Sequence, residues 1–282
     1  MAQDRMQRQR FELKYMLEEA TALAVRDFVS AHLDLDEASL GKPNRSYRVN
    51  SIYFDSDPLY TFWDWVNSNR NRFKLRMRFY DSSPDTPVFL EIKRRVGSCI
   101  LKERCAIRKS AAPLIAAGQF PPEEALFSRE AKHQVALGHF IALVSILGAK
   151  PKALVTYLRE AYVDPKNDDI RVTLDREVRI TPRETVDFNL NMPTYVQPFG
   201  QRVILEIKFN NRFPNWLNEM VQSLSLTRSA AAKYCEGMAS LQHPELANVP
   251  VRPIASHAID LLAEESSRAR TEALNPQLPL SA

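Results

Sequence analysis

The segment FKLRMRFY, residues 73–80, places Lys74, Arg76 and Arg78 at every second position, with apolar residues between them. Side chains of a β-strand alternate between its two faces, so this segment is predicted to be a strand with one basic and one apolar face. The segment VFLEIKRR, residues 88–95, alternates in the same way, and similar runs occur at 10–15, 101–108, 156–162, 170–177 and 204–209. We therefore predict a sheet curled so that its charged face lines an interior, while helices cover its apolar face.

The composition fits one large domain or two ordinary ones. The chain has 282 residues, of which 45% are hydrophobic, enough for a substantial core. Its net charge of +4, from 38 basic and 34 acidic residues, does not by itself indicate nucleic-acid binding, and none is expected. Basic residues are concentrated between residues 70 and 108, where few acidic residues oppose them. This part of the chain is predicted to bind an anion.

The cysteines and the N-terminus indicate a reduced compartment. Cys99, Cys105 and Cys235 show no metal-ligand spacing, and the sequence begins without the apolar segment of a secretory signal. No stretch approaches the roughly 18 apolar residues of a membrane span. We expect a cytoplasmic protein without a transmembrane segment.

The predicted elements divide the chain into a domain at residues 1–242 and a linker with a helical tail at 243–282. Helices are expected at 17–32, after 57, and at 215–224, 229–241 and 254–273. The segment 110–148 is also expected to be helical, with a break at Gly118, Pro121 and Pro122. Strands are expected at 9–16, 45–54, 70–80, 87–95, 98–108, 151–162, 170–180 and 202–209. This content predicts an α+β fold.

The basic residues on alternate strand positions are the first candidate site. They are Lys74, Arg76, Arg78, Lys93, Lys102, Arg104, Arg159, Arg171 and Lys208. Guanidinium and ammonium groups bind phosphate oxygens, so a triphosphate or polyphosphate fits them. Because so many inward charges of one sign would repel each other, Arg76→Ala or Arg78→Ala is expected to stabilise the ligand-free fold. The alternative is that these residues form the solvated face of an open sheet.

Carboxylates interrupt the basic faces and are candidate metal ligands. Mg²⁺ or Mn²⁺ takes hard oxygen ligands, commonly one or two carboxylates together with phosphates and water. Glu206 is the first choice and Glu12 the second, whereas Glu91 and Asp175 are expected to pair with basic neighbours. Pairing remains an alternative for the first two as well.

Helical residues add weaker signals. Lys233 lies on the predicted helix after the last strand, where it could reach a phosphate chain. The aromatic residues Tyr60, Phe62, Trp63 and Trp65 are more often core than a base-stacking platform. The sequence contains no GxSxG, P-loop or GxGxxG motif, so hydrolase-triad and Rossmann chemistry are unsupported.

The ordered motifs resemble the VTC domain, the polyphosphate polymerase branch of the triphosphate tunnel metalloenzyme (CYTH-like) superfamily. They are RFELKY, SIYFDS, FKLRMRFY, VFLEIKRR, LKER, VTYLREAY, RVTLDRE, LEIKF and AAKYCEG, and they extend from residue 8 to 241. The resemblance implies an eight-stranded antiparallel β-barrel that forms a triphosphate tunnel, with helices packed outside. It also implies ATP and inorganic polyphosphate as partners and Mn²⁺ or Mg²⁺ as cofactor.

The resemblance assigns roles to residues at matching positions. Lys14, Arg76, Arg78, Lys93 and Lys233 would be catalytic, with Lys102, Arg159 and Arg171 contacting phosphates and Glu206 holding the metal. Lys74, Arg104 and Lys208 join the phosphate-binding set, and Glu12 joins the metal site, from their strand positions. The chain departs from related patterns at two positions. Arg10 replaces the first Glu of the hydrolytic ExExK motif, in agreement with the VTC branch, and Ala232 stands where Ser is common.

The resemblance, together with the basic strand faces, implies a metal-dependent polyphosphate polymerase that transfers the γ-phosphoryl group of ATP to a polyphosphate chain. Two alternatives stay open. The same tunnel could hydrolyse triphosphates or nucleotides, or it could bind polyphosphate without catalysis. Transfer of polyphosphate across a membrane would need a membrane-protein partner.

Overall fold

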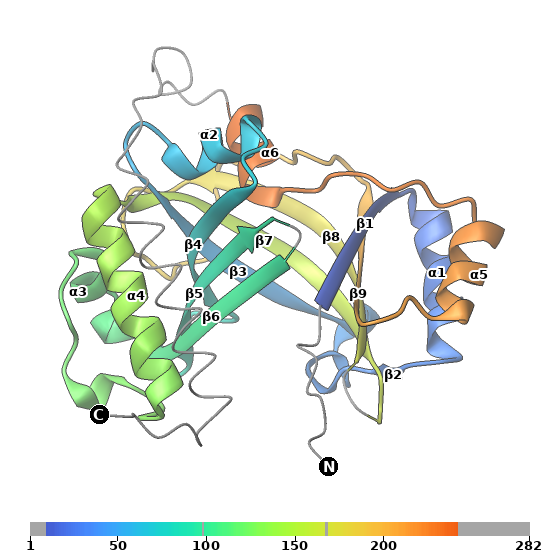
Figure 1. Cartoon of the computed structure of the whole chain (residues 1–282), viewed down its shortest axis with the longest axis horizontal. Coiled ribbons are helices and arrows are strands. Elements are labelled where there is room, and N and C mark those ends of the chain that lie inside the picture. Colours follow the sequence, from blue (N-terminus) through green and yellow to red (C-terminus); the bar gives the residue numbers. More distant parts are fainter. Residues whose placement is uncertain (1–9, 98, 167–168, 242–282) are drawn as a thin grey trace, which may run out of the picture.

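The computed structural model describes residues 10–97, 99–166 and 169–241 (Figure 1). Its described strands are β1 (Arg10–Leu17), β2 (Asp34–Leu35), β3 (Ser46–Asp55), β4 (Asn71–Phe79), β5 (Pro87–Val96), β6 (Cys99–Arg108), β7 (Lys150–Val163), β8 (Ile170–Pro182) and β9 (Val203–Asn210). Its described α-helices are α1 (Glu19–Ser30), α2 (Tyr60–Val66), α3 (Ala112–Ala116), α4 (Ala131–Leu147), α5 (Asn215–Ser223) and α6 (Lys233–Ser240). Each of the eight predicted strands is present, with ends that differ by at most two residues.

The strands form one antiparallel sheet in the order β1-β9-β8-β7-β3-β4-β5-β6, and the short β2 pairs with β7. The predicted antiparallel sheet with outer helices is confirmed, but closure into a barrel is not. Within the described residues, β1 and β6 are edge strands that approach each other without a backbone ladder between them. Closure depends on the tilt and stagger of all strands together, which alternation within one strand does not report.

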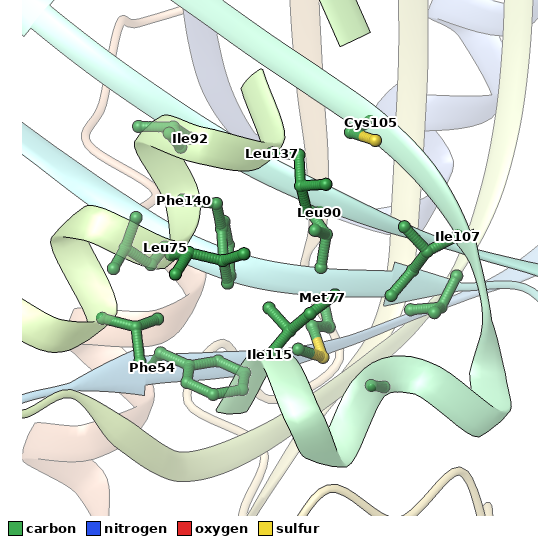
Figure 2. Close-up of a cluster of buried hydrophobic side chains, with 14 of the residues drawn as sticks. Phe54, Leu75, Met77, Leu90, Ile92, Cys105, Ile107, Ile115, Leu137 and Phe140 are labelled. Atoms are coloured by element: carbon green, nitrogen blue, oxygen red, sulfur yellow. The ribbon is translucent and has the colours of Figure 1, made fainter. Parts of the chain in front are cut away.

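Helices α3 and α4 cover the outer face of β4, β5 and β6. Side chains between Lys74, Arg76 and Arg78 point outward here: Leu75 and Met77 are fully buried in a core with Phe140 of α4 (Figure 2). Gly148 ends α4 in a left-handed conformation with φ of 56°, which an L side chain rarely adopts. The alternation therefore separates an apolar outer face from a charged inner face.

A second core lies where α1 and α5 pack against β1, β8 and β9, on the right in Figure 1. Val25 and Val29 of α1 and Leu217 of α5 are buried against Val172 and Ile207 of the sheet. Because helices cover these strands from outside, the opposite face of β1, β8 and β9 is turned toward the interior.

Helices α2 and α6 lie together at one end of the curled sheet, at the top of Figure 1. Asp55, at the end of β3, accepts hydrogen bonds from the backbone of Thr61 and Phe62 at 2.9 and 3.1 Å and from the Tyr234 hydroxyl of α6 at 3.0 Å. One buried carboxylate thus fastens both helices to the sheet. Phe62 is buried with them, as expected for a core aromatic residue.

The predicted tail at residues 243–282 lies outside the described residues, so the proposed domain boundary stays a prediction. No described helix is long and apolar enough to cross a membrane.

Candidate functional site

A cavity of about 340 Å³ lies inside the curled sheet. Ten of the residues predicted from the sequence line it: Glu12, Lys14, Lys74, Arg76, Arg78, Lys93, Arg159, Glu206, Lys208 and Lys233. They come from β1, β4, β5, β7 and β9 and from the start of α6. The structure therefore gathers side chains that are more than 200 residues apart in the sequence around one space.

The first charged cluster surrounds Glu91, whose side chain is 1% exposed. Its carboxylate accepts a hydrogen bond from Arg76 Nε at 2.8 Å and pairs with Lys102 Nζ at 2.6 Å. Burial acts to raise the pKa of Glu91, but Arg76, Arg78 and Lys102 hold it well below its usual value. Glu91 therefore stays ionised and fixes the guanidinium of Arg76 at the cavity wall.

The second cluster joins β1, β5 and β9. Lys14 Nζ lies 3.2 Å from Glu12 and 3.6 Å from Glu206, and Lys93 Nζ donates to both oxygens of Glu12 at 3.0 and 2.9 Å. Glu206 also pairs with Lys208. The bond between Lys93 and Glu12 connects β5 with β1 across the seam that no described backbone ladder closes. Side-chain charge thus links the edge strand β1 to β5, the strand next to the opposite edge.

Burial and neighbouring charges shift the pKa values of Lys14 and Lys93 in opposite directions. Burial lowers the pKa of Lys93 to about 8, with Lys14 acting in the same direction and Glu12 opposing. Burial also acts to lower the pKa of Lys14, but Glu206 and Glu12 raise it above its usual value. Of Lys14 and Lys93, Lys93 is therefore the one whose charge changes near pH 8.

The third cluster places α6 over the cavity. Asp175 of β8 is fully buried and accepts two hydrogen bonds from Arg159, at 2.7 and 2.8 Å, while Lys233 Nζ lies 2.8 Å away. Burial acts to raise the pKa of Asp175, but Arg159 and Lys233 lower it to about 2. The paired Asp175 holds Lys233 at the cavity wall.

These three clusters correct the expectation of a repulsive, uncompensated basic interior. Glu12, Glu91, Asp175 and Glu206 alternate with the cations and neutralise much of their charge. The expected pairing of Glu91 with basic neighbours is confirmed, and Asp175 pairs with Arg159 and Lys233. Removing Arg76 or Arg78 would leave buried Glu91 with fewer cationic partners, so Arg76→Ala and Arg78→Ala are each expected to destabilise the ligand-free fold.

Three predicted phosphate-binding residues lie outside the cavity lining. Lys102 and Arg104 of β6 are partly exposed beside Glu91, on the edge strand. Arg171 of β8 forms an ion pair with Asp36 at 2.6 Å. Asp36 lies in a loop remote in sequence, so strand alternation could not reveal this pairing.

The sequence reading missed the tyrosines of the cavity wall. The Tyr53 hydroxyl accepts a hydrogen bond from Arg76 Nη1 at 3.0 Å, and the Tyr157 hydroxyl accepts one from Arg78 at 3.2 Å. Burial acts to raise the pKa of Tyr53, but Arg76 and its cationic neighbours lower it to about 8. The inward positions of Tyr53 and Tyr157 on their strands could have identified them from the sequence. Only charged side chains were considered as candidates, so these neutral ones were missed.

The carboxylates that could hold a metal are Glu206 and Glu12. The residues that the structure describes contain no group of three or more His, Cys, Asp or Glu side chains arranged for a metal ion. Glu206 and Glu12 both line the cavity, and Lys14 lies within 4 Å of each. This oxygen-only donor set fits a hard divalent cation whose remaining ligands come from phosphate and water.

Among the known proteins similar to this chain, one belongs to the vacuolar transporter chaperone complex. Vacuolar transporter chaperone complex subunit 4 of Schizosaccharomyces pombe is 20% identical over 276 residues, covering 84% of this chain and 38% of that protein. The chain therefore spans 38% of the length of this relative. The crystal structure of a putative adenylate cyclase from Bacillus halodurans has 13% sequence identity and a TM-score of 0.45, covering 80% of this chain and 95% of that chain.

The family model of the VTC domain matches residues 9–242, which include every described strand, every described helix and the whole cavity lining. The match covers well over half of the chain. The chain belongs to the VTC domain family.

Proposed function

We propose that this chain is a metal-dependent polyphosphate polymerase that transfers the γ-phosphoryl group of ATP to the end of an inorganic polyphosphate chain. The observation that carries the proposal is the cavity, in which cations from five strands and one helix face a space of about 340 Å³. Membership of the VTC family and the relative named for the vacuolar transporter chaperone complex support a role connected with polyphosphate.

The cations would align donor and acceptor phosphates and neutralise the charge of phosphoryl transfer. Arg76 presents a guanidinium fixed by Glu91 and Tyr53, and Lys14, Lys93 and Lys233 present ammonium groups from other walls. Phosphoryl transfer needs little covalent help from the protein, so positioning and electrostatic stabilisation can supply most of the catalysis. Arg78, Arg159, Lys74 and Lys208 would extend the same phosphate-binding wall.

Glu206, with Glu12 beside it, would hold Mn²⁺ or Mg²⁺. A divalent cation bound there would supply charge neutralisation for the triphosphate oxygens. Both glutamates are paired with lysines in this structure. When the ligands bind, the lysines would pair with phosphate and the carboxylates would bind the cation.

A phosphorus-31 NMR time course of the purified protein with ATP and Mn²⁺ tests the proposal. We expect resonances of internal phosphates to grow together with ADP. Release of orthophosphate without chain growth would instead identify a triphosphatase or nucleotide hydrolase, and unchanged ATP with retained polyphosphate binding would identify a non-catalytic binding module.

Affinity for tripolyphosphate is expected to fall as the pH rises through about 8, because Lys93 and Lys102, whose pKa values are both about 8, lose their positive charge. Ionisation of Tyr53 adds negative charge over the same range. Calorimetric titrations between about pH 7 and 9 measure the effect. Lys93→Arg should make the fall shallower, since guanidinium stays charged throughout. Affinity that is constant over this range in the native protein would contradict the prediction.

We further propose a cytoplasmic location and a membrane-protein partner for any transfer of polyphosphate across a membrane. The partner's chemistry is not specified by the cavity.

A further inference from the structure

Three aromatic side chains gather at the end of β4 that lies away from α2 and α6. They are Tyr47 of β3, Tyr80 directly after β4, and Phe89 of β5. The Tyr80 ring centroid lies 6.1 Å from that of Tyr47 and 6.0 Å from that of Phe89. Helix α2 leads into the other end of β4, so this cluster and the α2–α6 pair mark opposite ends of the curled sheet (Figure 1). The proposed function has so far given these aromatics no role.

The cluster directly adjoins the phosphate-binding wall. Tyr47 is the cross-strand partner of Arg159, and Phe89 is the partner of Arg78. Both arginines line the cavity. Tyr80 follows Arg78 by two residues and so lies about 7 Å further along the same strand direction. A triphosphate held by Arg78 and Arg159 would therefore place its attached group at this cluster.

The cluster already accommodates a flat, cationic group. The guanidinium of Arg104 lies 3.6 Å from the ring centroid of Phe89. Tyr80 is 39% exposed, which leaves ring surface available to a ligand. Exposed aromatic rings and Arg planes bind nucleobases by stacking, and every base offers a π-face.

The opposite end of the sheet also carries aromatic rings, including Trp65 and Tyr234 beside Lys74, but its cations have different partners. There Arg72 and Arg95 donate to backbone carbonyls, and Lys74 donates to the sulfur of Cys235. Within the described residues none of the three forms an ion pair with a carboxylate, whereas Arg104 does so at the aromatic end. Unneutralised cations favour a polyanion, so this end suits phosphate, and the aromatic end suits the nucleoside.

We propose that the base of the nucleoside triphosphate stacks on Tyr80, within the cluster formed with Tyr47 and Phe89, while its phosphates extend past Arg78 and Arg159 into the cavity. This assignment rests on the proposed function, since it names the place of the nucleoside in the same substrate.

The test compares dissociation constants for ATP and for inorganic tripolyphosphate, measured at one pH and one Mg²⁺ concentration. Tyr80→Ala should weaken ATP binding by on the order of tenfold and leave tripolyphosphate binding unchanged. Tyr80→Phe retains the ring and should retain ATP affinity. Trp65→Ala is the matched control, because Trp65 lines the cavity beside Lys74 near α2 and α6. It should alter both dissociation constants by the same factor.

Equal weakening of both ligands by Tyr80→Ala would overturn the inference and make the ring part of the phosphate site. A selective loss of ATP in Trp65→Ala, with none in Tyr80→Ala, would overturn it by placing the base at the other end. In both cases the proposed function survives. If the native chain bound neither ligand, the proposed function would fail and the inference with it.

Discussion

Glu206→Gln is expected to lower the rate of ADP release from ATP and Mn²⁺ by about two to three orders of magnitude, because a neutral amide is a poor ligand for a hard cation. Glu206 lies in the cavity wall and is only 7% exposed. Burial acts to raise its pKa, but Lys208, Lys14 and Lys93 hold it well below its usual value. The residue is therefore ionised at neutral pH and available to a metal ion. Electron paramagnetic resonance of free Mn²⁺ measures the accompanying loss of metal affinity independently of turnover.

Glu160→Gln provides the matched control for this prediction. Glu160 is also a buried, paired glutamate, bound to Arg176 at 2.9 Å and to the Tyr162 hydroxyl, but it does not line the cavity. Its substitution should reduce thermal stability and leave Mn²⁺ affinity intact. Native metal affinity and turnover in Glu206→Gln would show that Glu206 serves only as the ion-pair partner of Lys14 and Lys208.

Asp175→Asn is expected to lower the free energy of unfolding of the ligand-free protein by about 3 kcal/mol or more, because it leaves Arg159 and Lys233 without their shared carboxylate. For a chain of this size the melting temperature should fall by roughly 10 °C. Tripolyphosphate should raise the melting temperature of the variant more than that of the native protein, since an anion replaces the missing charge. Calorimetric melting with and without tripolyphosphate measures both effects.

Acid titration and a surface variant complete this experiment. The pKa of Asp175 is about 2 in the folded protein against an ordinary value of 3.8, so its stabilising contribution is present above about pH 4 and lost as the pH falls toward 2. The native protein and Asp175→Asn should therefore have similar free energies of unfolding near pH 2. Asp57→Asn removes a carboxylate that is 59% exposed and pairs with Lys150 and Lys152, and it should cost less stability than Asp175→Asn. Equal melting of the Asp175 and Asp57 variants would refute the neutralising role of Asp175.

The alternation of charged and apolar residues was sufficient to locate the main strands, because one strand face is buried against helices and the other faces the cavity. It could not reveal β2, whose two residues are too few to show a period. It also could not decide whether β1 and β6 join, because edge pairing depends on strands remote in the sequence. The broken helical region was predicted correctly from Gly118 and the prolines that follow it, which separate α3 from α4.

The same alternation placed most of the candidate residues around one cavity but did not reveal their partners. Glu12 and Lys93 are 81 residues apart, and Lys14 is hydrogen-bonded to the carbonyl of Ala231. Such contacts follow from the curl of the sheet rather than from local spacing. Tyr53 and Tyr80 escaped notice for a different reason: aromatic residues on strands ordinarily belong to the core, so their inward strand positions were not taken as part of a site.

For the proposed site, the carboxylates held between the basic residues predict that a polyanion and a divalent cation bind cooperatively. When phosphate takes the lysines, Glu12 and Glu206 lose their partners and face additional negative charge, so uptake of a cation becomes more favourable. Coupling between two equilibrium ligands is reciprocal: the factor by which tripolyphosphate tightens Mn²⁺ binding must equal the factor by which Mn²⁺ tightens tripolyphosphate binding. The proposed site would thus be a linked two-ligand system, and the free energy of interaction between the two ligands can be measured from either side.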